Sequence, residues 1–140
     1  MTAPLSSEPF ELQVVVEPTH LDDNRHVNNV VYLQWMNDAA VAHWTTVASD
    51  DARARIGWVA RRHEIDYHAP ALLGDALVVR TWIGEADGLR FLRFCEVRRA
   101  RDARLLASLR TVWIPVDATT GRPKRVPDDV RRQFSVGGGE

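Results

Sequence analysis

The sequence predicts an α+β domain in which an antiparallel β-sheet is curled around one long helix. Three observations predict this fold. A strand-like run at residues 12–17 comes first, a long helical stretch at residues 30–47 follows, and four strand-like segments separated by turn signals come last. Strands that are gathered after a single helix are typical of α+β domains with an antiparallel sheet.

The central helix is predicted because residues 30–47 are apolar on most of their circumference. Gln34, Asn37, Asp38 and Thr45 recur near the helical period and form one narrow polar stripe. A helix of this kind has to be buried on most of its sides. In a chain of 140 residues we therefore expect the sheet to wrap around it. Asn28 or Asn29 is expected to cap the helix start.

The later strands are predicted from alternating apolar residues bounded by turn signals. Ala69-Pro70 ends the first of them, and Glu85-Ala86-Asp87-Gly88 is a hairpin turn signal. We expect strands at residues 59–68, 77–83, 90–99 and 105–116, of which the last is the longest, and a short helix at residues 128–134.

Composition indicates one soluble domain, residues 10–136, with loose ends at residues 1–9 and 137–140. Hydrophobic residues make up 45% of the chain, which is enough for a core, and the net charge of −1 argues against a nucleic-acid binder. The single cysteine, Cys95, excludes an intrachain disulfide, favours a reducing compartment and is expected to pack in the sheet. The sequence has no signal-peptide pattern and no apolar run of membrane-spanning length. We therefore expect a cytoplasmic protein that binds no membrane.

A polar loop lies between the first strand and the helix, and it carries Asp22, Asp23, His26, Asn28 and Asn29. A carboxylate ahead of a helix start can act as a base or a nucleophile, while the free N–H groups of the helix polarise a carbonyl. Taken alone, an aspartate in such a loop is more often a cap or turn residue. Asp23 is more readily explained as a solvated neighbour than as a second catalytic group.

Three motifs follow one another along the chain. They are Asp22 with His26-Val27-Asn28-Asn29 and Tyr32; Ile65, Tyr67 and Pro70 with Gly74-Asp75; and Val116-Asp117 with Thr120-Gly121-Arg122-Pro123. In this order and spacing the chain resembles the hotdog-fold acyl-CoA thioesterases, specifically the 4-hydroxybenzoyl-CoA thioesterase-like group. One departure is Arg25, where several members have glycine or another small residue; Arg25 could pair with Asp23 or tune Asp22.

The resemblance implies an enzyme that hydrolyses an acyl-CoA thioester to free acid and CoA. It implies Asp22, Asn29 and His26 as catalytic residues, with Asp22 as general base or nucleophile and a backbone N–H near Asn29 on the thioester oxygen. Asn28 and Tyr32 would bind the substrate, and Arg90 would bind the CoA nucleotide. The acyl group, and whether acyl carrier protein replaces CoA, stay open.

An open edge strand and the resemblance together predict self-association, as a homodimer or a dimer of dimers with the active site between subunits. We expect no cofactor and no metal, because no metal-ligand motif accompanies the histidines; His63 and His68, five residues apart, would face opposite sides of a strand. The main alternative is a non-catalytic hotdog module that binds acyl thioesters, against which Asp22 argues. A dehydratase on the same fold would need a histidine–carboxylate arrangement that the sequence lacks.

Overall fold

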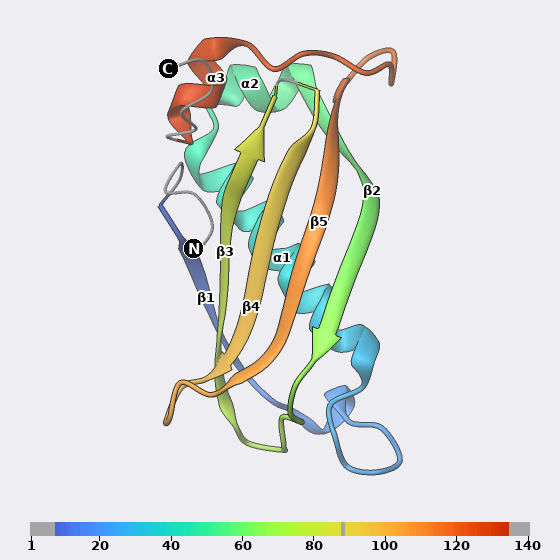
Figure 1. The fold of residues 1–140 in the computed structure, drawn as a ribbon, viewed down its shortest axis with the longest axis vertical. Helices are drawn as coiled ribbons and strands as arrows, with labels where there is room; N and C mark the ends of the chain where they lie inside the picture. The colour runs from blue at the N-terminus through green and yellow to red at the C-terminus, as the bar shows by residue number, and fades with distance from the viewer. Residues whose placement is uncertain (1–7, 88, 135–140) are drawn as a thin grey trace.

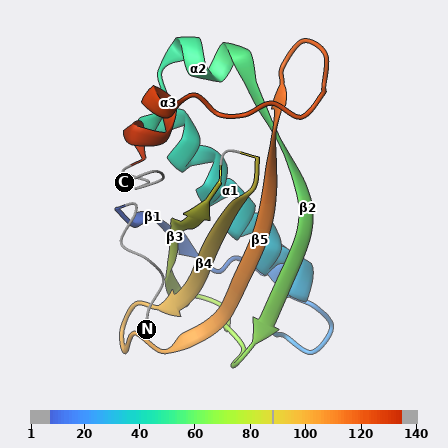
Figure 2. The ribbon, with the colours of Figure 1, turned by 45° about the horizontal axis from the view of Figure 1, so that its top comes forward.

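The structure is a computed structural model that describes residues 8–87 and 89–134. Its elements are β1 (Phe10–Val15), η1 (Pro18–His20), α1 (Asn29–Val47), α2 (Asp50–Arg55), β2 (Ile56–Tyr67), β3 (Ala76–Ala86), β4 (Phe91–Arg99), β5 (Leu105–Asp117) and α3 (Asp128–Gln133). The strands form one antiparallel sheet in the order β1-β3-β4-β5-β2. The sheet curves around α1, which lies along one of its faces (Figures 1 and 2). The predicted α+β fold is confirmed.

Helix α1 begins within one residue of the predicted position because Asn28 caps it. The Asn28 side-chain oxygen accepts a hydrogen bond from the backbone N–H of Val30 at 3.1 Å. The buried residues of the helix include Trp35, Met36 and Ala39, which supply the apolar face that packs on the sheet. The 19-residue length of α1 then carries it from one end of the sheet to the other (Figure 1).

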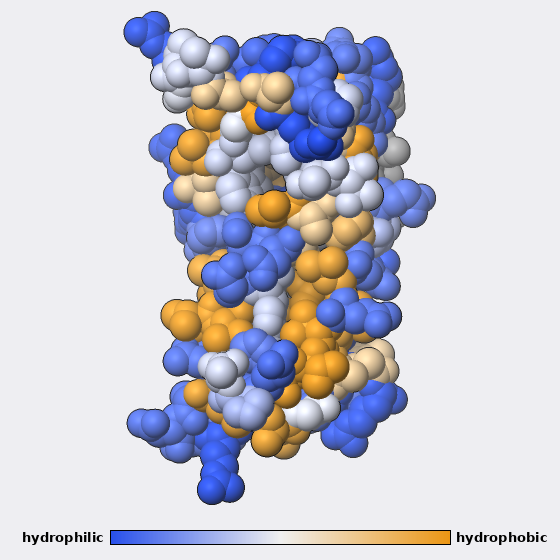
Figure 3. All heavy atoms as spheres, turned by 180° about the vertical axis from the view of Figure 1, so that it is seen from behind, coloured by the Kyte–Doolittle hydropathy of each residue, from blue (hydrophilic) through white to orange (hydrophobic). Residues whose placement is uncertain are grey.

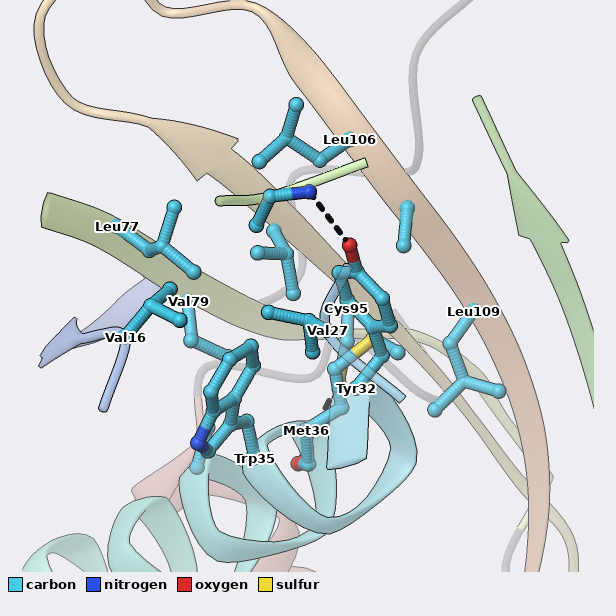
Figure 4. Close-up of a cluster of buried hydrophobic side chains, with 14 residues drawn as sticks. Val16, Val27, Tyr32, Trp35, Met36, Leu77, Val79, Cys95, Leu106 and Leu109 are labelled. Atoms are coloured by element: carbon cyan, nitrogen blue, oxygen red, sulfur yellow. Dashed lines mark hydrogen bonds between the residues drawn. The ribbon is translucent and has the colours of Figure 1, made fainter. Parts of the chain in front are cut away.

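Two hydrophobic clusters fill the space between α1 and the sheet. The cluster near the helix start includes Tyr32, Trp35, Met36 and Cys95 (Figure 4). Cys95 is 2% exposed, which confirms its packing role. The second cluster lies at the far end of α1, where α2 and α3 close the barrel-like curve, and includes Phe134.

Several local features differ from the prediction. Strand β1 spans Phe10–Val15 rather than residues 12–17, η1 was not predicted, and β3 continues to Ala86, into the predicted turn. Helix α2 was not predicted, and β2 begins at Ile56 rather than at residue 59. The Ser49 hydroxyl caps α2 by accepting a hydrogen bond from the Ala52 N–H at 3.1 Å. The negative charges of Asp50 and Asp51, in the first turn, interact favourably with the positive end of the helix dipole. The predicted tails lie largely outside the described residues, as does Gly88 of the predicted turn.

The two edges of the sheet differ in length. Strand β1 has 6 residues, whereas β2 has 12, and within the described residues β2 pairs only with β5. Residues 59–64 of β2 are exposed, with Val59 at 51%. A long edge with free backbone groups is a surface that native proteins usually cover. Among the described residues, no helix is long and apolar enough to cross a membrane.

Candidate active site

The loop between η1 and α1 is closed by its own backbone and by the carboxylate of Asp22. Leu21 and Val27 form an isolated antiparallel bridge, and the Asp22 N–H donates to the His26 carbonyl at 2.8 Å. One carboxylate oxygen of Asp22 accepts from the backbone N–H groups of Asn24, at 2.8 Å, and His26, at 3.1 Å. The other oxygen has no hydrogen-bond partner among the described residues, so Asp22 shapes the loop with one oxygen and keeps the second available.

The start of α1 keeps one backbone donor unused. The Asn28 N–H donates to the His20 carbonyl at 2.9 Å, and the Val30 N–H is capped by the Asn28 side chain. The Asn29 N–H has no acceptor within residues 8–87 and 89–134. It is therefore a free donor at the positive end of a long helix, a few residues after Asp22. A contact of this N–H with a thioester oxygen stays a prediction.

The second motif packs against the first. The Tyr67 hydroxyl donates to the Asn29 carbonyl at 3.0 Å, and the Tyr32 hydroxyl accepts from the Ala71 N–H at 2.9 Å. Tyr32 is 2% exposed, and burial raises the pKa of its phenol. Its ring is part of the core beneath the helix start (Figure 4), and a contact with substrate stays a prediction.

Asp23, Arg25 and His26 are exposed on the loop. The described ion pairs include none of them, so the suggested pairing of Arg25 with Asp23 is not present, and an influence of Arg25 on Asp22 stays a prediction. Arg25 has a left-handed backbone conformation, with φ of 63°. Substrate contacts of His26 and Asn28 also stay predictions.

Arg90 lies at the opposite end of the sheet from Asp22. It follows the β3–β4 turn, near α3, whereas the Asp22 loop lies at the start of α1 (Figure 1). Asp87 organises this turn by accepting from the Leu89 and Arg90 N–H groups, and these bonds lower the pKa of its carboxyl. Arg125 donates to the Asp87 carbonyl at 3.0 Å, so two arginines gather there. Within one chain, Asp22 and Arg90 are thus not neighbours.

The third motif is a structural loop at that same far end. Asp117 accepts from the N–H groups of Thr119 and Thr120 at 2.8 and 2.9 Å, which lowers the pKa of its carboxyl. An isolated bridge joins Val116 to Pro123. The motif therefore marks the fold, and its described contacts do not reach Asp22.

Sequence reasoning missed a cavity of about 310 Å³ at the far end of α1. Its lining is mainly apolar, with Trp44, Trp58 and Trp113 among the residues, but it includes Arg93. The sequence held a signal, because Arg93 alternates with Phe91 and Cys95 and so shares their inward face. Within the described ranges, no three His, Cys, Asp or Glu side chains lie close enough to hold a metal ion.

Comparison with known proteins shows that this chain is similar to thioesterases in sequence and in structure. Residues 16–134 match the thioesterase-like superfamily. The long-chain acyl-CoA thioesterase FadM of Escherichia coli K12 is 22% identical over 130 residues, which cover 89% of this chain and 96% of that protein. A thioesterase of Thermus thermophilus, solved with coenzyme A and Zn, has a TM-score of 0.78 and 25% identity, covering 89% of this chain and 90% of that one. A 1,4-dihydroxy-2-naphthoyl-CoA thioesterase of Synechocystis has a TM-score of 0.76 and 22% identity, with 92% and 96% coverage.

A five-stranded antiparallel sheet around one helix, with an acidic loop at the helix start, defines the hotdog-fold class of thioester hydrolases. The chain belongs to the thioesterase-like superfamily, and the predicted resemblance is confirmed.

Proposed function

We propose that this protein hydrolyses acyl-CoA to the free acid and CoA, with Asp22 activating the attacking water and the Asn29 N–H receiving the thioester oxygen. The observation that carries the proposal is that two free groups lie close together in sequence at the start of α1. One is the carboxylate oxygen of Asp22 that accepts no hydrogen bond from the described residues, and the other is the backbone N–H of Asn29. Asp22 keeps one oxygen free, and the Asn29 N–H has no acceptor among the described residues.

The chemistry follows from these two groups. A water molecule transfers a proton to Asp22 as its oxygen attacks the thioester carbon, and negative charge collects on the carbonyl oxygen. A fixed donor aimed at that charge lowers the barrier by about 3 kcal/mol. The tetrahedral intermediate then collapses, the C–S bond breaks, and the CoA thiolate leaves and takes the proton back from Asp22, which restores the carboxylate. If Asp22 instead attacks the carbonyl itself, the CoA thiolate leaves and a mixed anhydride forms. Attack of H₂¹⁸O on the aspartyl carbon of that anhydride then places the label in the aspartate during a single turnover.

Asp22→Asn tests the proposal sharply, because an asparagine side-chain oxygen can still accept the loop's two N–H bonds. Loop geometry is kept while the base is lost. We expect kcat for free-thiol release from acyl-CoA to fall at least about 100-fold. Asp23→Asn is the matched control, since it removes one charge from the same loop and should keep turnover. Wild-type turnover in Asp22→Asn would contradict the assignment and favour the binding-module alternative.

We further propose a homodimer formed by pairing the open edges of β2 around a two-fold axis. The support is the 12-residue exposed edge together with the separation of Asp22 and Arg90 within one chain. When two β2 strands pair antiparallel, the second sheet is rotated by a half turn relative to the first. The end of the partner's sheet that carries the partner's Arg90 then lies beside the end of the first sheet that carries Asp22. One substrate could then use both residues. Further association into a dimer of dimers is compatible with this pairing.

We also propose that the acyl group is carried by CoA and that the protein acts in the cytoplasm. An acyl-[acyl-carrier-protein] hydrolase of Cuphea viscosissima is 25% identical over 77 residues, 55% of this chain and 19% of that protein. The more fully covered relative is an acyl-CoA thioesterase, so we propose acyl-CoA as substrate. A single buried thiol fits a reducing cytoplasm. Parallel assays with one acyl group on CoA and on acyl carrier protein test the choice of carrier.

A further inference from the structure

The cavity at the far end of α1 is open to solvent and built mainly from apolar side chains, aromatic and aliphatic. Its walls come from α1, β2, β3, β4, β5 and α3, and Val41, on its rim, is 53% exposed. Seen from the α1 side, the surface is hollowed in the half that holds α2 and α3 (Figure 3). A volume of about 310 Å³ is at the lower end of the range for small-molecule sites.

A buried guanidinium lies in this cavity wall. Arg93 is 7% exposed, since it alternates with Phe91 and Cys95 on the inward face of β4. One of its terminal nitrogens donates to the His43 Nδ1 at 2.9 Å and to the Thr81 hydroxyl at 3.0 Å. Both acceptors are neutral groups, and no carboxylate forms an ion pair with Arg93 in the described part of the chain.

The environment of Arg93 leaves its charge uncompensated. Burial and the positive charge of Arg93 lower the pKa of His43 to about 4, so the imidazole is neutral at pH 7. Burial lowers the pKa of Arg93 to about 10, so the guanidinium stays charged. A buried charge without a counter-ion is unfavourable, and charged groups in protein interiors are normally paired.

Two further donors in the same wall lack acceptors. The indole N–H groups of Trp58 and Trp113 are buried and have no hydrogen-bond partner among the described residues. Buried donors are nearly always bonded, so each unsatisfied one calls for an explanation. The two indole nitrogens have almost no accessible surface, so the donor group that lines the cavity is the guanidinium of Arg93. An occupant with acceptor oxygens and a negative charge would match it.

We propose that this cavity binds an apolar carboxylate, with the carboxylate on Arg93 and the hydrocarbon body among the apolar side chains. The guanidinium fork matches a carboxylate in geometry and charge. The cavity accommodates a medium-length fatty acid or an aryl carboxylic acid, not the nucleotide part of CoA. Two sources supply this chemistry: a free carboxylic acid, or the distal carboxylate of a dicarboxylic acyl thioester.

The distance along α1 makes the second source feasible. At about 1.5 Å per residue, Asn37 and Trp44, which line the cavity, lie about 12 and 22 Å along the axis from Asn29. The adjoining space toward the helix start, bounded by Leu33 and Met36, is too narrow to hold a water molecule, so an acyl chain that reaches the cavity from Asn29 has to displace these side chains. This source alone rests on the proposed function, because it requires the thioester to lie at Asn29.

The first experiment measures binding without catalysis. Wild-type protein is titrated with octanoate, and 1-octanol serves as the uncharged ligand of similar size. Trp44, Trp58 and Trp113 are three of the five tryptophans, so intrinsic fluorescence reports occupancy. We expect octanoate to bind at least about 10-fold more tightly than 1-octanol and to raise Tm more at equal concentration. Equal affinity for the two ligands would overturn the proposal.

Variants of Arg93 test the residue itself. Arg93→Met should weaken octanoate binding at least about 10-fold and leave 1-octanol binding nearly unchanged. Arg93→Lys, which keeps the charge without the fork, should fall between. Arg104→Met, at an exposed arginine, is the matched control and should bind as the wild type does. Undiminished octanoate binding in folded Arg93→Met would contradict the assignment, and the wild-type comparison stands if that variant does not fold.

A second experiment separates the two sources. Hydrolysis of octanoyl-CoA is compared with that of the mono-CoA thioester of octanedioic acid, in wild type and in Arg93→Met. A preference for the dicarboxylic substrate that Arg93→Met abolishes identifies the distal carboxylate. Octanoate binding without such a preference identifies the free acid. If the protein binds a carboxylate at Arg93 but hydrolyses neither substrate, the proposed function is wrong and the proposed carboxylate site is still supported.

Discussion

The hydroxyl of Tyr32 accepts the backbone N–H of Ala71 at 2.9 Å and so joins the start of α1 to the segment after β2. Both residues are buried, at 2% and 0% exposure. Tyr32→Phe removes the acceptor and leaves the Ala71 N–H unsatisfied in the core. We expect a loss of about 1–2 kcal/mol in the free energy of unfolding, measured by urea denaturation.

Tyr67→Phe is the matched control for that change. The Tyr67 hydroxyl donates to the Asn29 carbonyl, but the residue is 43% exposed, so water can replace the lost donor. We expect a smaller loss than for Tyr32→Phe. Equal losses in the two variants would show that burial of the Ala71 N–H does not matter.

Stability should decline as the pH is lowered because of His43. Its folded pKa, about 4, lies below the ordinary value of 6.5, so the unfolded chain takes up the proton first as the pH falls. The stabilisation is complete above about pH 6.5, declines between pH 6.5 and about 4, and changes no further below that. With about 1.4 kcal/mol per pKa unit, up to about 3 kcal/mol is involved. Urea denaturation at pH values from 7 to 4 measures it.

The control for this prediction compares two histidine variants. His43→Gln should reduce the slope of stability against pH, since it removes the titrating group. His68→Gln changes an exposed histidine, hydrogen-bonded to Ser108, and should leave the slope as it is. A slope unchanged in His43→Gln would assign the acid sensitivity to the carboxylates.

Arg90 should affect the binding of CoA rather than the chemical step. A contact with a phosphate far from the thioester contributes equally to ground and transition states, so Arg90→Ala should raise KM and leave kcat little changed. Raised salt should weaken substrate binding more in wild type than in the variant. Arg125→Ala removes a second arginine at the same turn and serves for comparison. An unchanged KM in Arg90→Ala removes Arg90 from the site.

Subunit mixing tests whether Asp22 and the partner's Arg90 serve one substrate. Asp22→Asn and Arg90→Ala chains are unfolded together, refolded as a mixture and assayed below the wild-type KM. If sites are shared, half of the dimers are mixed and each regains one intact site, so about a quarter of wild-type activity returns. Activity equal to the average of the two parent variants would show that each chain uses its own residues.

The central helix and the later strands could be predicted because their patterns extend over many residues. Helix α1 combines Trp35, Met36 and Ala39 with a narrow polar stripe, and its start has a capping residue. Helix α2 has only 6 residues, too few for a periodic pattern, although its Ser49 cap and its charges were present in the sequence.

The candidate site was predictable only where its parts are close in sequence. Asp22, Asn28 and Asn29 lie on one short loop, and the structure brings Tyr67 to them through a contact 38 residues apart. No local pattern shows that Arg90 lies at the other end of the sheet, because that distance depends on how the strands pair. Arg93 was missed because a charged residue on an inward face contradicts the usual preference for apolar side chains there.

The left-handed backbone of Arg25 has a consequence for how the acidic loop opens. A side chain at φ of 63° raises the free energy of the closed loop by about 1–2 kcal/mol relative to glycine. The free-energy difference between the closed loop and its locally unfolded states is therefore smaller than the hydrogen bonds of the loop alone would suggest. Arg25→Gly should slow amide hydrogen exchange at Asn24 and His26, whose N–H groups bond to Asp22 in the closed loop. Arg25 forms no ion pair with Asp22, yet its backbone conformation sets how often the Asp22 carboxylate separates from these two N–H groups.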